Sequence, residues 1–489
     1  MWNVNEHPTG RRRARGCRNR FKSGIAAFGT AIQSDFPEIR LGSALEKTES
    51  AVCLGYSHRV WAGYPGRGTG NKTGPFQPAN LESTRQHIST PQKPTDMRTI
   101  TAKTASAVVL LFLAMGSFAQ STATQSPSIN VVTSAVPFLR ITPDARSGAM
   151  GDLGVATSPD ANSQYYNPAK YPFAAGRGGV ALNFTPWLKQ LGLNDVYLGG
   201  VSGYYKLDEE QALSGSLRYF SLGDVHLTDR NGMDLMTVNP YEYSVDAGYS
   251  RKLSQRLSMG VALRYIHSNL TGNRSINGVA YKPGNSVAGD LGLFYTTSPD
   301  QGSGWNIGMA LTNLGARIGY TTDLNNRSFI PANFALGVNY SKTFQEVHKV
   351  SLGMDVRKLL VPTPPDMADS AAVEKYRRGS VVSSWFSSWS DAPGGFNEEL
   401  QEFTASVGAE YTYDHLFSVR GGYHYENPLK GNRQYFSLGA GIMYSVFNLN
   451  LSYLIPSGSG VNRNPLSNTL RFSLVFDFGG KAETAKRSD

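Results

Sequence analysis

The side chains that could act as nucleophiles or metal ligands in this sequence are few and widely spaced. The histidines beyond residue 119 are His226, His267, His348, His415 and His424. No two of them have the short, regular spacing of metal ligands, and Asp414 with His415 reads as a tight turn between strands. The sequence contains no G-x-S-x-G, H-E-x-x-H or phosphate-loop motif. We therefore predict no catalytic residue, no metal and no cofactor, and expect a protein that is not an enzyme.

The two cysteines, Cys17 and Cys53, both lie within the first 96 residues. The chain beyond them can form neither a disulfide nor a thiolate metal site, so its stability must come from burial or from closure of a sheet. Residues 1–96 lack sustained apolar periodicity. We interpret them as a disordered extension upstream of the true start.

A secretory signal peptide is predicted at residues 97–119. Met97 is followed by Arg98 and Lys103, then by the apolar run AVVLLFLAMG and the small-residue site SFAQ. This order of a basic region, a short apolar region and a cleavage site is that of an exported protein. Cleavage after Ala119 would leave Gln120 as the first residue of the mature chain.

The positive charge of the chain belongs almost entirely to this N-terminal part. The formal net charge is +10, whereas residues 120–489 carry 31 basic and 30 acidic side chains, a net charge of +1. A nearly neutral mature chain gives no reason to expect nucleic acid as a partner.

From residue 178 onward the sequence alternates between apolar and polar residues with a period of two. In 241–250, Tyr241, Tyr243 and Val245 fall on one face, and Glu242 and Ser244 fall on the other. Strand side chains alternate between faces, so each such segment has one apolar side. This pattern suits either a soluble antiparallel sheet or a membrane barrel with a polar interior.

The lengths of the links favour the membrane barrel. The fourteen predicted strands are 178–187, 196–206, 211–221, 241–251, 256–269, 287–297, 304–314, 332–342, 348–358, 403–413, 415–426, 434–445, 446–456 and 469–478. Links after even-numbered strands are tight, and those after odd-numbered strands are mostly long. An even strand number with short turns at one end and long loops at the other is typical of outer-membrane barrels. The sequence thus predicts an all-β transmembrane antiparallel barrel over 178–478, followed by a flexible tail, 479–489.

The stretch before the first strand, within 120–177, carries a recognisable motif. Ala145-Arg146 and Met150-Gly151 precede Asp160-Ala161 and the run Tyr166, Asn167, Pro168 and Ala169. These residues resemble the FadL-like outer-membrane family, whose members fold this segment into the barrel as an N-terminal hatch. Pro168 fixes its own φ and keeps Asn167 out of the helical region, and the asparagine side chain can bond local backbone.

Within that family the chain is most similar to outer-membrane barrels of the type IX secretion system, over 130–478. The resemblance implies a non-enzymatic protein whose partners are the outer-membrane translocon, cargo proteins with a C-terminal signal domain, and a surface sortase complex that attaches cargo to lipopolysaccharide. The alternative is a FadL-like channel for a hydrophobic small molecule. The polar strand faces carry charges, such as Arg218, Asp246, Arg264, Arg420 and Arg471, which favour a salt-bridged lumen over an apolar channel.

The longest link, 359–402, is predicted to be an extracellular loop. It displays Trp385, Phe386 and Trp389 among serines and glycines. Aromatic anchors of this kind suit a partner-binding loop. Folding over the barrel mouth, or insertion into the lipid interface, is the competing explanation.

Overall fold

The computed structural model describes residues 40–41, 130–187, 195–228, 233–272, 274–276, 279–323, 326–365, 369–457 and 469–479. The predicted extension, apart from Arg40 and Leu41, and the predicted signal peptide lie outside the described residues, as does 480–489 of the tail. Among the described residues, no helix is long and apolar enough to span a membrane.

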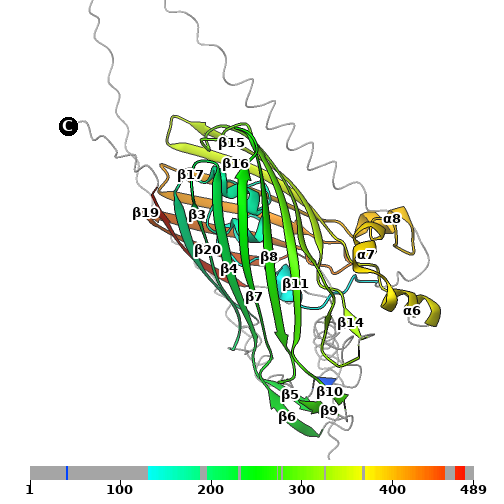
Figure 1. The fold of residues 1–489 in the computed structure, drawn as a ribbon. Helices are drawn as coiled ribbons and strands as arrows, with labels where there is room; N and C mark the ends of the chain where they lie inside the picture. The colour runs from blue at the N-terminus through cyan, green and yellow to red at the C-terminus, as the bar shows by residue number, and fades with distance from the viewer. Residues whose placement is uncertain are drawn as a thin grey trace, which may run out of the picture. The chain divides into compact units, whose positions relative to one another are not determined.

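Fourteen antiparallel strands form a closed barrel (Figure 1), which confirms the predicted fold class and strand number. The strands are β2 (Gly178–Pro186), β3 (Val196–Lys206), β4 (Gln211–Leu222), β7 (Tyr241–Lys252), β8 (Leu257–Asn269), β11 (Gly284–Thr296), β12 (Gly304–Gly315), β15 (Asn333–Phe344), β16 (His348–Leu359), β17 (Thr404–Tyr413), β18 (Phe417–Tyr425), β19 (Tyr435–Tyr444), β20 (Phe447–Pro456) and β21 (Leu470–Phe478). Each strand pairs with its neighbours in sequence order, and β2 pairs with β21 to close the wall. No sheet edge is therefore left unpaired in the barrel, as lipid requires.

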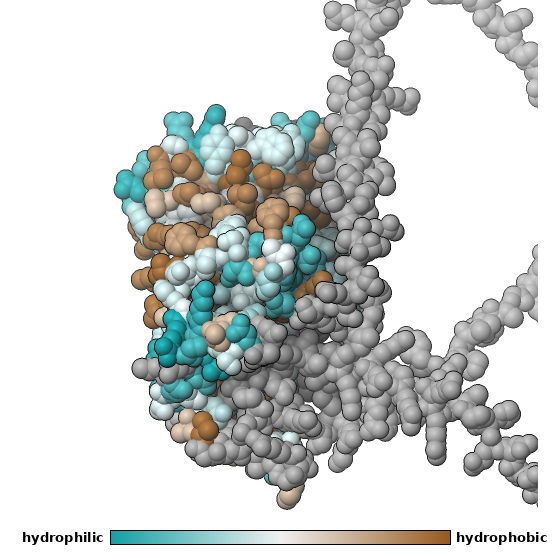
Figure 2. Space-filling view, turned by 90° about the vertical axis from the view of Figure 1, so that its right-hand side faces the viewer, coloured by the Kyte–Doolittle hydropathy of each residue, from teal (hydrophilic) through white to brown (hydrophobic). Residues whose placement is uncertain are grey.

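The two faces of each strand differ in the way the alternation predicts. On β8, Leu263 is 70% exposed and points outward, whereas its neighbour Arg264 is 2% exposed and points into the barrel. The outward apolar residues gather into a band on the barrel surface, with hydrophilic surface towards the ends (Figure 2). This band is the lipid-facing wall, and we call the two ends of the barrel the loop end and the turn end, after their connections.

The links at the loop end carry short elements of their own. They contain the strands β5 (Val225–Thr228), β6 (Asp234–Val238), β9 (Ser275–Ile276), β10 (Val279–Ala280), β13 (Ile318–Gly319) and β14 (Arg327–Ser328), and the helices α6 (Ser370–Arg378), α7 (Val381–Ser387) and α8 (Phe396–Gln401). β5 also pairs with β1 (Arg40–Leu41). Half of the residues in the predicted loop 359–402 are therefore helical, and the loop lies to one side of the barrel in Figure 1.

The chain from 130 to 177, which we call the N-terminal segment, packs against inward-facing side chains of the barrel. It forms η1 (Pro137–Arg140), α4 (Ala145–Ala149), α5 (Ser163–Tyr166) and η2 (Pro168–Phe173). α4 contacts β18 to β21, and η2 contacts β3, β4, β7, β8 and β11. Towards the loop end, Phe138 and Leu139 of η1 join an apolar cluster with Trp187, Phe220 and Tyr435.

Candidate functional site

Polar side chains on several barrel strands hold the N-terminal segment. Ser473 of β21 accepts a 2.8 Å hydrogen bond from the Ala145 amide, which begins α4. Ser437 of β19 accepts one of 2.8 Å from the Gly151 amide. Asp355 of β16 accepts from the Gly154 and Val155 amides, at 2.8 and 3.0 Å. These bonds satisfy backbone amides that would otherwise be buried without partners.

Arg146 makes the strongest link between the segment and the wall. Its guanidinium forms a two-point ion pair with Glu410 of β17, and another nitrogen lies 2.8 Å from Asp160 of the segment itself. Arg420 of β18 pairs with the same Glu410 at 2.6 Å. A bidentate arginine–carboxylate pair fixes orientation as well as distance.

The motif residues Tyr166 to Ala169 each contact a different part of the interior. The Tyr166 hydroxyl donates to Asp144, the N-cap of α4, at 2.8 Å. Asn167 is extended, with φ −162°, accepts from the Ala169 amide and donates to the Leu293 carbonyl of β11 at 2.9 Å. Pro168 is the first residue of η2, and the Ala169 carbonyl accepts from Ser258 of β8. That these residues form a hatch stays a prediction.

The interior beside this segment is lined by ion pairs. Arg264 lies 2.5 Å from Asp246 and 2.8 Å from Asp290, and Arg471 lies 3.1 Å from Asp152. A cavity of about 80 Å³ remains, enough for a few water molecules. Its charged lining residues are Arg140, Asp152, Arg264, Arg357, Lys358, Glu402, Glu426, Lys430 and Arg433. Such a lining favours water and ions over an apolar ligand.

The three predicted loop aromatics have different surroundings. Phe386 is 74% exposed. Trp389 is 41% exposed, and its ring contacts Phe334 of β15 and Phe403, with centroids 5.3 and 6.1 Å apart. Trp385 is half-buried, and its indole nitrogen has no hydrogen-bond partner. The binding of a partner protein by these residues stays a prediction.

The same loop holds a cluster of ionised groups that the sequence reasoning missed. Lys358 of β16 lies 2.5 Å from Glu399 of α8 and 2.8 Å from Glu402, the residue that follows this helix. Lys430, from the link between β18 and β19, lies 2.5 Å from Glu398 and 3.1 Å from Glu402. We call these five residues the lysine–carboxylate clasp. The signal in the sequence was three glutamates within five residues, 398–402.

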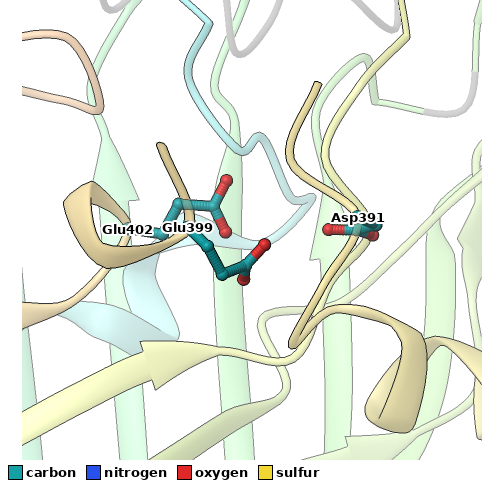
Figure 3. Close-up of side chains that lie close together, drawn as sticks. All are labelled: Asp391, Glu399 and Glu402. Carbon is teal, nitrogen blue, oxygen red and sulfur yellow. The ribbon is translucent and has the colours of Figure 1, made fainter. Parts of the chain in front are cut away.

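Asp391 stands beside the clasp, and its carboxylate lies within 4.8 Å of those of Glu399 and Glu402 (Figure 3). Three carboxylates this close resemble a cation site, but the ammonium groups of the two lysines already pair with Glu399 and Glu402. Asp391 accepts from the amide of Thr363 at 3.2 Å. The arrangement fastens the loop to the barrel, and we assign no metal to it.

The surroundings shift the pKa values of Asp391 and Glu398 in opposite directions. Burial raises the pKa of Asp391, and the nearby carboxylates of Glu402 and Glu399 raise it further. For Glu398, burial is outweighed by hydrogen bonds from Lys430 and from the Gly394 amide, so its pKa is lowered. At neutral pH the Glu398 charge therefore stabilises the loop, whereas the Asp391 charge opposes its folded arrangement.

Comparison with known proteins gives one family match for the sequence and several low-identity matches to solved structures. The model of the family described as "Type IX secretion system protein PorV" matches residues 123–366. A search of curated proteins finds no match. Among solved structures, the toluene transporter TbuX of Ralstonia pickettii is 13% identical and the toluene transporter TodX of P. putida 14% identical. Each alignment covers 68% of this chain and 98% of the other, with TM-scores of 0.40 and 0.41. A FadL homologue of Pseudomonas aeruginosa is 9% identical over 69% of this chain and 99% of its own, with a TM-score of 0.37.

Proposed function

Because this chain belongs to the PorV family, and is thus an outer-membrane barrel of the type IX secretion system, we propose that it carries cargo between two membrane complexes. In this proposal it binds cargo proteins through their C-terminal signal domain at the translocon. It then delivers them to the surface sortase complex that attaches them to lipopolysaccharide. The family match is the observation that carries the proposal.

The interior of the barrel supports a shuttle rather than a channel. The N-terminal segment is bonded to the inner wall at many points, and we propose that it closes the lumen as a hatch. The remaining cavity is small and lined with charged groups. A conduit for a hydrophobic molecule needs a continuous apolar path, which this lining opposes.

We further propose that the loop end faces the outside of the cell. Outer-membrane barrels place short turns in the periplasm and long loops outside. Partner contacts with the surface complex would then be made by the loop end, whose links carry α6 to α8 and the small hairpins.

The test is an affinity pull-down of the tagged full chain from detergent-solubilised outer membrane, followed by mass spectrometry. We expect the translocon and cargo with the C-terminal signal domain to co-purify, and cargo lacking this domain to be lost. If no type IX component is recovered, the shuttle proposal is wrong. Uptake of a hydrophobic dye by vesicles containing the barrel would support the channel instead.

A further inference from the structure

The helices α7 and α8 expose large apolar side chains. Val382 and Phe386 lie one turn apart on α7, and Phe396 and Leu400 lie one turn apart on α8. Residues four apart share one side of a helix. All four are more than half exposed, with Phe386 at 74% and Phe396 at 75%. We call these four residues together with Trp389 the helical apolar face.

This face lies outside the barrel wall. On β16, Asp355 points inward to the N-terminal segment, whereas Leu352 is 49% exposed on the outside. Lys358, near the loop end of β16, is buried and pairs with Glu399 of α8 and with Glu402. Its register partner on β15 is Phe334, which packs against Trp389. Trp389 therefore continues the outward-facing surface of β15 at this end of the wall.

Elsewhere, aromatic rings mark the same end of the wall. Phe184, Tyr197, Tyr219, Tyr241 and His267 lie on β2, β3, β4, β7 and β8, each within three residues of the loop end of its strand. Successive rings are 5.8 to 6.2 Å apart. Such a ladder is typical of the aromatic belt at the membrane–water interface. At β15 the corresponding ring, Phe334, is covered by Trp389, so the helical apolar face takes the outermost position there.

Positive charge lies on the neighbouring helix. Lys375, Arg377 and Arg378 are exposed in the last turn of α6, and Arg378 pairs with Glu374. Arg317 holds this end of the helix, with hydrogen bonds of 3.0 and 2.9 Å to the carbonyls of Tyr376 and Gly379. Basic residues beside Trp, Phe and Leu are typical of helices that lie in a membrane interface.

We propose that α6 to α8 form an interfacial anchor that binds lipids of the outer leaflet. The helical apolar face contacts the acyl chains next to β15 and β16, and the basic end of α6 contacts the phosphates of the headgroups. Two observations favour lipid over a protein as the occupant: Trp389 of the face packs on the outward-facing Phe334 of the wall, and basic side chains complement anionic headgroups.

The test places an environment-sensitive probe on the face. In the full chain carrying Cys17→Ser and Cys53→Ser, Phe386→Cys is labelled with NBD and reconstituted into phosphatidylcholine–phosphatidylglycerol vesicles brominated on the acyl chains. Leu336→Cys, on the outer wall of β15, is the lipid-exposed control. Ser387→Cys, exposed on α7 but outside the apolar face, is the matched control on the same helix.

We expect the probe at position 386 to be quenched by the brominated chains nearly as strongly as the probe at 336, and more strongly than the probe at 387. Quenching at 386 by aqueous iodide but not by bromolipid would overturn the proposal. So would a probe at 386 that becomes shielded only when solubilised outer-membrane proteins are added, because the occupant would then be a protein. Labelling adds no charge inside the barrel, and heat-modifiable migration on a gel checks that each variant is folded.

Discussion

Arg146 of the N-terminal segment and Glu410 of β17 form a two-point ion pair, with both nitrogen–oxygen distances at 3.0 Å. The pair joins residues 264 positions apart in sequence and is mostly buried. Arg420 shares the same carboxylate. The arginine of the family motif is thus a structural residue that ties the segment to the wall.

Replacing Arg146 with Gln should destabilise the folded protein by about 3 kcal/mol, because a buried carboxylate loses one of its partners. The shift is measured as a lower urea midpoint for loss of the folded band on an unheated gel. Arg251→Gln is the control, since its pair with Glu210 is exposed and 3.9 Å long, and it should change stability by roughly 0–1 kcal/mol. Equal midpoints for the two variants would contradict this role of Arg146.

Gly422→Ala should displace the N-terminal segment while leaving the barrel able to form. A Cβ atom at this inward position of β18 would lie 2.1 Å from the backbone carbon of Met150, and a backbone atom cannot avoid the clash by a change of side-chain rotamer. Single-channel recording in planar bilayers should show increased conductance. Gly199→Ala is the matched control, because a Cβ there meets nothing within 4 Å. If the conductance of the Gly422→Ala variant does not increase, the proposal that the segment blocks the lumen is contradicted.

Lys358→Met should release α8 from the wall without unfolding the barrel. It removes the ammonium group that pairs with Glu399 and Glu402, and it leaves their charges together in a partly buried site. Limited proteolysis should cut within 380–402 faster than in the parent protein, while heat-modifiable migration persists. Lys375→Met, which removes an exposed lysine of α6, should leave the cleavage rate unchanged.

The pH dependence of this loop should separate Asp391 from Glu398. A carboxyl whose pKa is raised on folding stabilises the folded loop more as the pH falls, so Asp391→Asn should protect the loop at neutral pH and reduce the gain on acidification. A carboxyl whose pKa is lowered on folding stabilises the folded loop less as the pH falls. Glu398→Gln should therefore destabilise the loop at neutral pH and have a smaller effect in acid. Protease half-lives of the loop between neutral and acidic pH measure both effects, and the same sign for both variants would refute this assignment.

The protein isolated from membranes should begin at Gln120. This follows from the basic region, apolar run and cleavage site at 97–119. N-terminal sequencing of the membrane-extracted protein checks it. Recovery of peptides from residues 1–90 in that protein would show that the extension is retained.

The barrel strands could be predicted because their alternation is local and strong. β7 was expected at 241–251 and spans Tyr241–Lys252, and β3 was expected at 196–206 and spans those residues. The helices of the loop could not be predicted in the same way. α6, α7 and α8 have nine, seven and six residues, and helices this short depend on tertiary contacts, such as those of α8 with Lys358, rather than on their own periodicity.

The contacts of the candidate site were also beyond sequence reasoning. The motif around Asn167 could be recognised by its resemblance to a family, but its partners on β8 and β11 are an ordinary serine and a backbone carbonyl. The clasp draws on β16, on α8 and on the link after β18. Nothing in the sequence near any one of these places indicates the others.

The bonds between α4 and the last strands also set an order of assembly. The Ala145 amide is bonded to Ser473, which lies 328 residues further along the chain. Contacts at such sequence separation form late, since the intervening chain must first be ordered. α4 therefore takes its final place only after β21 has been made and has paired with β2. A chain that ends before β21 lacks both the strand that closes the wall against β2 and the serine that holds the start of α4.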